Sequence, residues 1–194
     1  YDDGLTNLTG ETYYVGAKGD EIADYSYSIK KNSNRVVNSV SVFWYGTSDA
    51  DKVRAENAGT ETAMYMSESY DCADIDDIDK DYSDDSQTNL TGETYYVGAK
   101  GDEIANYSYS IKKNSNSVVN SVSVFWYDGG IDDNGTPEDT TDDTELPPRR
   151  AENAGTEDAM VMSESYDCGD IDDIDKDYDD GLTNLTGETY YVGA

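Results

Sequence analysis

Hydrophobic and polar side chains alternate along much of this chain, so that every second residue is apolar. The clearest stretch is residues 21–31, where apolar positions are separated by acidic or hydroxyl side chains: Ala23, Tyr25, Tyr27 and Ile29 against Asp24, Ser26 and Ser28. A period of two places successive side chains on opposite faces of a strand, whereas a helix needs a period of about 3.6. The pattern therefore predicts a half-buried strand with one face in water.

Residues 36–45 predict the hairpin partner of this strand, because the Lys-Asn-Ser-Asn segment at 31–34 favours a turn. One face of the partner carries Val36, Val40, Val42 and Trp44, and the other ends in Phe43 and Tyr45. Aromatic residues on both faces predict a central strand. Shorter strands are predicted at 11–17, 53–57 and 61–69, the last presenting Met64 and Met66 together. Strands of this number and length suggest a small antiparallel β-sandwich.

The chain repeats itself. Residues 7–45 recur as 89–127 with only Asp24/Asn106 and Arg35/Ser117 different, and residues 54–82 recur closely as 150–178. The 7–17 motif appears a third time at 184–194. We therefore expect a first sandwich at 1–87, a second at 88–178 with a long acidic loop at 128–150, and the start of a third repeat at 179–194. The third copy is expected to complete the preceding sheet or to bridge two units.

Charge narrows the range of partners. The 43 acidic and 13 basic residues give a net charge of −30, and the chain has no His. Phosphate contacts need Lys and Arg, so nucleic acid is not expected as a partner. No apolar stretch has the roughly 18 to 20 residues of a membrane helix, so no membrane insertion is expected.

Catalytic chemistry is not evident in the composition. Without His, the commonest general base and any Ser-His-Asp arrangement are missing. Carboxylates are abundant, but they gather in acidic runs, where the desolvation that raises a carboxyl pKa is not expected. The sequence therefore predicts a protein that is not an enzyme and that has no organic cofactor.

Glycosylation sequons point to a secreted chain. They occur in the contexts NLT, NYS and NGT, at Asn7, Asn89, Asn106, Asn134 and Asn184. Covalent glycans are accordingly expected on a protein that is extracellular or at the cell surface.

Two acidic segments follow the repeats. Asp175, Asp177 and Asp179 alternate ahead of a Gly, and Asp79 and Asp81 are the counterparts of two of them in the first unit. This spacing is similar to the first half of a calcium loop, although no Glu closes it. Two interpretations follow: these carboxylates bind calcium, or the segments are solvated linkers whose like charges repel one another.

One cysteine lies beside each acidic segment, Cys72 and Cys168. Three outcomes stay open: a disulfide between units folded back on each other, a disulfide between neighbouring chains, or two free thiols.

Alternation, sequons, Asp-rich junctions and tandem near-identity together resemble the immunoglobulin-like β-sandwich repeats of microbial extracellular filaments, adhesin stalks and surface-layer proteins. The resemblance implies an all-β chain of two tandem small antiparallel sandwiches plus a terminal strand. By this resemblance the chain is a structural repeat of a glycosylated filament, with copies of itself as partners through strand sharing. The alternative is an adhesin or lectin-like binding module on a cell-surface stalk.

Overall fold

The computed structural model describes residues 8–31, 33, 35–72, 74–77, 89–113, 115, 117–132, 144–174 and 184–191. These residues form β-strands joined by turns and by short 3-10 helices, which confirms the predicted all-β class. In the described part of the chain, no helix is long and apolar enough to cross a membrane.

The first repeat supplies strands close to the predicted ones. Its elements are β1 (Gly10–Val15), β2 (Ile22–Ile29), β3 (Val37–Tyr45), β4 (Val53–Arg54), η1 (Ala55–Asn57), β5 (Met64–Tyr70) and η2 (Ile75–Asp77). The segment expected as a strand at 53–57 is a two-residue strand followed by a 3-10 turn.

The second repeat has the same order with an added hairpin. Its elements are β6 (Leu90–Val97), β7 (Ile104–Ile111), β8 (Val119–Tyr127), β9 (Ile131–Asp132), β10 (Thr144–Glu145), β11 (Arg149–Arg150), η3 (Ala151–Asn153), β12 (Met160–Tyr166) and η4 (Ile171–Asp173). The third copy of the motif forms β13 (Leu185–Tyr190).

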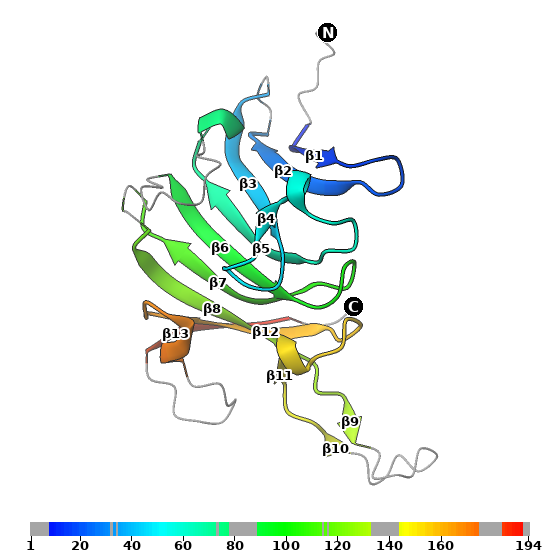
Figure 1. The fold of residues 1–194 in the computed structure, drawn as a ribbon. Helices are drawn as coiled ribbons and strands as arrows, with labels where there is room; N and C mark the ends of the chain where they lie inside the picture. The colour runs from blue at the N-terminus through cyan, green and yellow to red at the C-terminus, as the bar shows by residue number, and fades with distance from the viewer. Residues whose placement is uncertain are drawn as a thin grey trace.

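One continuous sheet replaces the two separate sandwiches that the sequence suggested. The described strands form an 11-stranded antiparallel sheet in the order β1-β2-β3-β5-β6-β7-β8-β12-β13, with β4 beside β3 and β11 beside β8. Figure 1 shows these strands following one another in a single curved layer, with the β9–β10 hairpin extending away from it. The reason is β6, which pairs with β5 of the first repeat and with β7 of the second. β13 pairs with β12 and so extends the sheet of the second repeat.

The main core lies on one face of this sheet and crosses the boundary between the repeats. One cluster joins Val40, Val42 and Met66 of the first repeat to Leu90 and Ile111 of the second. Tyrosines at cross-strand positions extend it: the ring of Tyr95 stacks on that of Tyr107 with centroids 4.7 Å apart. Such aromatic pairs stabilise a sheet face beyond their buried area.

The opposite face carries a smaller cluster of Ile22, Tyr45 and Ala55, with Met64 packed against it. Met64 and Met66 therefore belong to different faces, contrary to the prediction that they lie together. The physical cause is a register irregularity in the β3–β5 pairing at this point, where Met66 pairs with Trp44 and Met64 with Tyr45.

The strand-ending glycine of the recurring motif has a steric reason. Gly16 and Gly98 have φ of +118° and +124°, and a Cβ added to either would lie 2.6 Å or 2.4 Å from a backbone oxygen across the turn. Only glycine adopts this conformation at no steric cost, so both of these copies of the motif make the same tight turn out of their strand.

Candidate functional site

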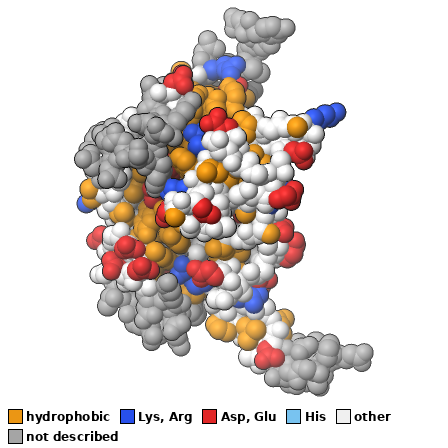
Figure 2. Space-filling model, viewed as in Figure 1, with side chains coloured by type: hydrophobic (Ala, Val, Ile, Leu, Met, Phe, Trp, Pro, Cys, Tyr) orange, Lys and Arg blue, Asp and Glu red, His pale blue; other side chains and the backbone are white. Residues whose placement is uncertain are grey.

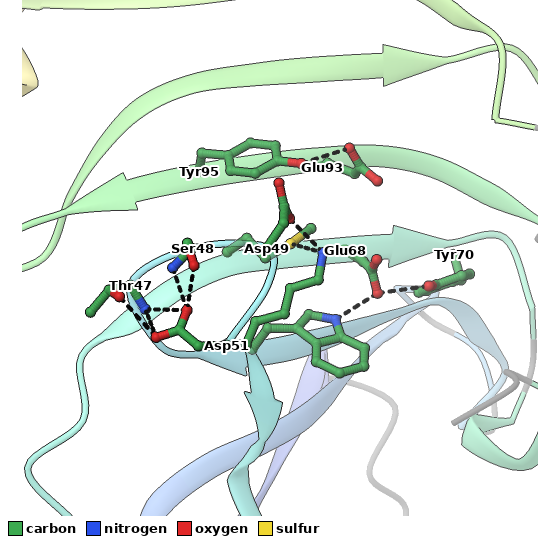
Figure 3. Close-up of polar contacts among 11 residues, drawn as sticks. Thr47, Ser48, Asp49, Asp51, Glu68, Tyr70, Glu93 and Tyr95 are labelled. Carbon is green, nitrogen blue, oxygen red and sulfur yellow. Dashed lines mark hydrogen bonds and ion pairs between the residues drawn. The ribbon is translucent and has the colours of Figure 1, made fainter. Parts of the chain in front are cut away.

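Two glutamates face each other in the centre of the sheet. Glu68 of β5 is the direct antiparallel partner of Glu93 of β6. Figure 3 shows them on neighbouring strands, with Asp49 beside them. Glu68 is fully buried and Glu93 is half-buried. Because these strands come from different repeats, the pair exists only where the repeats join.

The alternation of side chains along β5 places Glu68 on the buried face of the sheet. It lies between Met66 and Tyr70 on the inward face of β5, and all three side chains are buried. Its Oε2 accepts hydrogen bonds from the indole Nε1 of Trp44 at 2.6 Å and from the Tyr70 hydroxyl at 2.8 Å. Its Oε1 has no hydrogen-bond partner among the described residues. One oxygen is thus fixed by two donors, and the other is buried without a donor among the described residues.

Burial changes the acidity of both groups. Desolvation raises the pKa of Glu68, against the opposing effect of the hydrogen bonds from Tyr70 and Trp44. Desolvation also raises the pKa of Glu93, and the negative charge of Glu68 raises it further. Two carboxyls that oppose each other's ionisation favour a state in which a proton is retained by the pair.

A short loop between β3 and β4 brings a cation to this pair. The ammonium of Lys52 lies 2.7 Å from Asp49 Oδ1 and 6.0 Å from the centre of the Trp44 ring, and its side chain is almost fully buried. Its positive charge lowers the pKa of both glutamates, against the larger desolvation effect.

Asp51 holds this loop in shape. Its carboxylate accepts hydrogen bonds from the backbone N–H groups of Thr47 and Ser48 and from both hydroxyls, as Figure 3 shows. These bonds, led by the Ser48 and Thr47 hydroxyls, lower the pKa of Asp51 to about 2.

The second repeat contains a partial copy of the arrangement. Glu164 pairs with Glu188, and its Oε2 accepts from Trp126 Nε1 at 2.5 Å and from the Tyr166 hydroxyl at 2.8 Å. Glu188, however, is exposed, and Pro148 occupies the position equivalent to Lys52. The copy therefore keeps the buried glutamate and lacks the half-buried partner and the cation.

The predicted glycosylation sites differ in their surroundings. Asn89 and Asn184 are exposed, whereas Asn106 is buried in β7 with its amide nitrogen donating to Glu152. Asn7 and Asn134 lie outside the described residues. Glycosylation stays a prediction, with the exposed sequons as the sterically open ones.

All five predicted calcium ligands lie outside the described residues: Asp79, Asp81, Asp175, Asp177 and Asp179. Within the described residues, no group of three or more Cys, Asp or Glu side chains could hold a metal ion. Calcium binding therefore stays a prediction.

Cys72 and Cys168 occupy equivalent, partly buried places and are not bonded to each other. Each thiol lies 3.4 Å from a backbone carbonyl two residues further on, at Asp74 and Asp170.

Sequence reasoning missed the glutamate pair. It placed carboxylates in the acidic runs, whereas the desolvated ones lie on strands among apolar residues. A signal was present, since alternation in the segment Met-Tyr-Met-Ser-Glu-Ser-Tyr puts Glu68 on the same face as Met66 and Tyr70. Alternation does not show which strand pairs with β5, so it could not predict that Glu93 of β6 faces Glu68.

Comparison with known proteins gives one match. The family model described as Glycosyl hydrolases family 16 matches residues 8–132, well over half of the chain. The matched span contains Glu68 and Glu93 and ends before Glu164. No curated protein and no solved structure was found to match.

This match corrects two expectations. The resemblance to immunoglobulin-like filament repeats is wrong, because the matching family is one of glycosyl hydrolases. The prediction that the chain is not an enzyme is contradicted by the same finding. The absence of His misled that prediction, since glycoside hydrolysis uses a pair of carboxyl groups and needs no imidazole.

Proposed function

The chain belongs to the glycosyl hydrolases family 16, and on this premise we propose that it hydrolyses glycosidic bonds with Glu68 and Glu93 as its two carboxyl groups. The observation that carries the proposal is the direct pairing of these two glutamates, each with a raised pKa, within the matched span.

The separation of the two groups favours one geometry. Directly opposed residues of an antiparallel pair have Cβ atoms about 4.5–5.5 Å apart. Glycosidases that retain the anomeric configuration have carboxyl groups about 5–5.5 Å apart, and inverting enzymes about 6.5–9.5 Å. The close Cβ atoms allow the two carboxyl groups to reach the shorter separation, and we propose a retaining mechanism on this ground.

The two environments support different roles. Glu68 is the more deeply buried, and its Oε1 has no hydrogen-bond partner among the described residues, so it is suited to carry a proton and donate it to the leaving oxygen. Glu93 is only half-buried, so water can reach its carboxyl group more readily than that of Glu68. We assign Glu68 as the general acid and Glu93 as the nucleophile.

Access requires movement of the covering loop. Glu68 is fully buried, Asp49 lies beside the pair (Figure 3), and the charge of Lys52 acts on both glutamates. The proposal therefore includes an opening of the loop at residues 47–52 before a sugar reaches Glu68. We further propose that the chain acts outside the cell or at its surface, which the exposed sequons at Asn89 and Asn184 support.

Mutation of the pair tests the assignment. We expect Glu68→Gln and Glu93→Gln to lower kcat on a polysaccharide substrate by a factor of about 100 to 10,000, because each removes a proton-transfer or nucleophilic group. The measurement is the release of reducing ends from a panel of polysaccharides.

The second repeat offers a matched control. Glu164→Gln removes an equally buried glutamate with equivalent Trp and Tyr donors, but outside the matched span. It should leave kcat within about twofold of the wild type. Equal losses in the Glu68→Gln and Glu164→Gln variants would contradict the assignment.

A second candidate is carbohydrate binding without hydrolysis, in keeping with the lectin-like alternative. It is supported by an open groove of about 420 Å³ on the opposite face, lined by aromatic side chains, Tyr14, Phe43 and Tyr45, and by Glu103 and Lys100 at one side. Aromatic faces stack on sugar rings while carboxylates accept hydroxyl hydrogen bonds. Saturable binding of a polysaccharide that the chain leaves intact would favour this candidate.

A further inference from the structure

The recurring motif occupies three different places in the sheet. β6 has β5 on one side and β7 on the other, whereas among the described strands β1 pairs with β2 alone and β13 with β12 alone. Figure 1 shows β1 and β13 at opposite ends of the sheet. The equivalent tyrosines differ accordingly: Tyr95 of β6 is 8% exposed, Tyr13 of β1 41% and Tyr190 of β13 65%. β6 therefore shows how the motif pairs when a strand lies on each of its sides.

The strand that β6 accepts from the first repeat has a close copy in β12. Both β5 and β12 read Met-x-Met-Ser-Glu-Ser-Tyr. They bind copies of the motif in the same register, with Met66 opposite Tyr95 and Met162 opposite Tyr190. A β12 strand that paired with β1 in this register would place Met162 opposite Tyr13.

The open edge of β1 has backbone groups directed towards such a strand. The carbonyl oxygen of Thr9 accepts a hydrogen bond from the N–H of Ile29 at 2.9 Å, so Thr9 directs its backbone groups towards β2. These groups alternate between the two edges of an antiparallel strand, and Thr12, three residues further on, therefore directs its N–H to the open edge. β1 can thus form a second ladder without losing its own.

A glutamate beside β1 matches a contact that joins the two repeats. Glu103, in the turn after β6, accepts a hydrogen bond through Oε1 from the backbone N–H of Met64 in β5, at 2.9 Å. The equivalent Glu21 accepts through Oε2 from Gly19 in its own turn, and among the described residues its Oε1 accepts no hydrogen bond. This oxygen can accept from the backbone N–H of Met160, which is the counterpart of Met64 in β12.

An arginine beside β1 offsets the charge that the pairing brings together. The shared register would place Glu164 of β12 opposite Glu11 of β1. Arg35 forms an ion pair with Glu11. The second repeat has Ser117 in place of Arg35, so this cation is particular to the open edge. A nearby positive charge reduces the repulsion between two facing carboxylates.

From these observations we infer that β1 of one copy pairs with β12 of a second copy, in place of that copy's β13. Five of the six residues of β13 are exposed, so little packing holds this strand. β1 arrives with Tyr13 stacked on Tyr25 at 4.7 Å, and pairing on its open edge buries Tyr13 as Tyr95 is buried in β6. Val161 of β12 stands where Tyr65 of β5 contacts Tyr95, so the ring keeps an apolar neighbour.

The two copies use different surfaces, so the association is head-to-tail and gives dimers and larger oligomers. It involves neither Glu68 nor Glu93, and it stands or fails independently of the proposed hydrolysis.

Proline at equivalent positions of β1 and β13 tests the inference. Thr12→Pro removes an N–H from the open edge of β1, a place where an edge strand tolerates proline. Tyr191 donates its N–H to Val161 of β12 at 2.9 Å, so Thr189, two residues earlier, also faces β12. Thr189→Pro should therefore loosen β13 and free β12 for a second copy.

Sedimentation velocity across a wide range of protein concentration measures the association. The buffer contains about 0.5 M NaCl, which screens the repulsion between chains of net charge −30. We expect the wild type to associate as its concentration rises, Thr12→Pro to associate about tenfold or more weakly, and Thr189→Pro to associate more strongly. A wild type that stays monomeric, or association that Thr12→Pro leaves unchanged, would overturn the inference. Weaker association of Thr189→Pro would also overturn it, because β13 would then form the junction.

Arg35→Ser provides a second test that leaves the fold intact. Ser117 already occupies the equivalent turn, with φ of 52° against 56° for Arg35. We expect the association to weaken by about two- to fivefold, as for the loss of a partly exposed ion pair. Lys31→Ser is the matched control, because it removes an equal charge from an exposed position of the same turn. Equal weakening in both variants would assign the effect to net charge and overturn the role of Arg35.

Discussion

At the scale of single residues, Glu68 holds an ionisable group at a position where the strand pattern requires an apolar one. Trp44 and Tyr70 satisfy one of its oxygens, yet burial still raises its pKa above the value of 4.5 for a solvated glutamate. A raised folded-state pKa favours folding when the group is protonated. This contribution is present below pH 4.5 and is lost as the pH rises through the folded-state pKa.

Glu68→Gln should therefore change the pH dependence of stability. We expect the variant to be as stable as the wild type near pH 4, and progressively more stable relative to it as the pH rises to about 8, because it carries no charge to bury. Urea unfolding between about pH 4 and pH 8 measures this difference. Glu188→Gln, at an exposed position, should follow the wild-type curve. A constant offset between wild type and Glu68→Gln across the pH range would show that Glu68 does not ionise on unfolding.

The pair also shows which part of the site a sequence can give. The inward position of Glu68 follows from its alternation with Met66 and Tyr70. The cation beside β1 is visible as the Arg35/Ser117 difference between repeats. Neither of these two sequence patterns shows which strands are neighbours in the sheet. The pairing of Glu68 with Glu93 exists because β5 and β6 are neighbours.

At the scale of elements, the stability of the covering loop at residues 47–52 depends on pH through Asp51. Asp51 receives backbone and hydroxyl hydrogen bonds from Thr47 and Ser48, which lower its pKa from 3.8 to about 2. A lowered folded-state pKa stabilises the turn at pH values above 3.8. This stabilisation is lost as the pH falls from about 4 towards about 2.

Asp51→Ala should open this turn at neutral pH. We expect amide exchange at Thr47 and Ser48 to accelerate by about tenfold or more, since both amides lose a charged acceptor. Hydrogen exchange followed residue by residue measures the effect, and the wild type should approach it between about pH 4 and about pH 2. Asp49→Asn removes the ion pair with Lys52 and keeps the turn, so its exchange rates should match the wild type. Similar acceleration in both variants would assign the turn's stability to Lys52 instead.

Strand positions were largely predictable, because each depends on local alternation. The predicted segment 36–45 matches β3, which is central as expected, with β2 and β5 on its two sides. Val36 was expected to share the face of Val40, Val42 and Trp44, but it lies just before β3 and is 48% exposed. A register irregularity between β2 and β3 near Ile29 puts Val37 in that place instead, and one-residue shifts of this kind leave no trace in the alternation.

At the scale of the whole molecule, alternation could not predict that the strands form one sheet and not two sandwiches. The apolar face of a sheet must be shielded from water, and a second sheet is only one way to shield it. Here the sheet curves, and tyrosines on neighbouring strands cover the face by packing on one another, as Tyr13 does on Tyr25 and Tyr95 on Tyr107. Figure 2 shows hydrophobic side chains running through the middle of the viewed face, between scattered acidic ones.

Because β6 hydrogen bonds to both repeats and one apolar cluster spans them, the two repeats should unfold together. Trp44 and Trp126 report on the first and second repeat, so the variants Trp126→Phe and Trp44→Phe isolate each signal. Within each single-Trp variant, we expect the urea midpoint from Trp fluorescence to equal the midpoint from circular dichroism, which follows the sheet of both repeats. Tyr95→Ala, which removes a buried ring from β6, should lower both midpoints together and cost about 3–5 kcal/mol of unfolding free energy, as for other large aromatic truncations. Tyr190→Ala truncates the equivalent but exposed tyrosine of β13 and should cost well under half as much. Two separate midpoints, or a Tyr95→Ala effect confined to one reporter, would mean that the repeats are independent domains despite their common sheet.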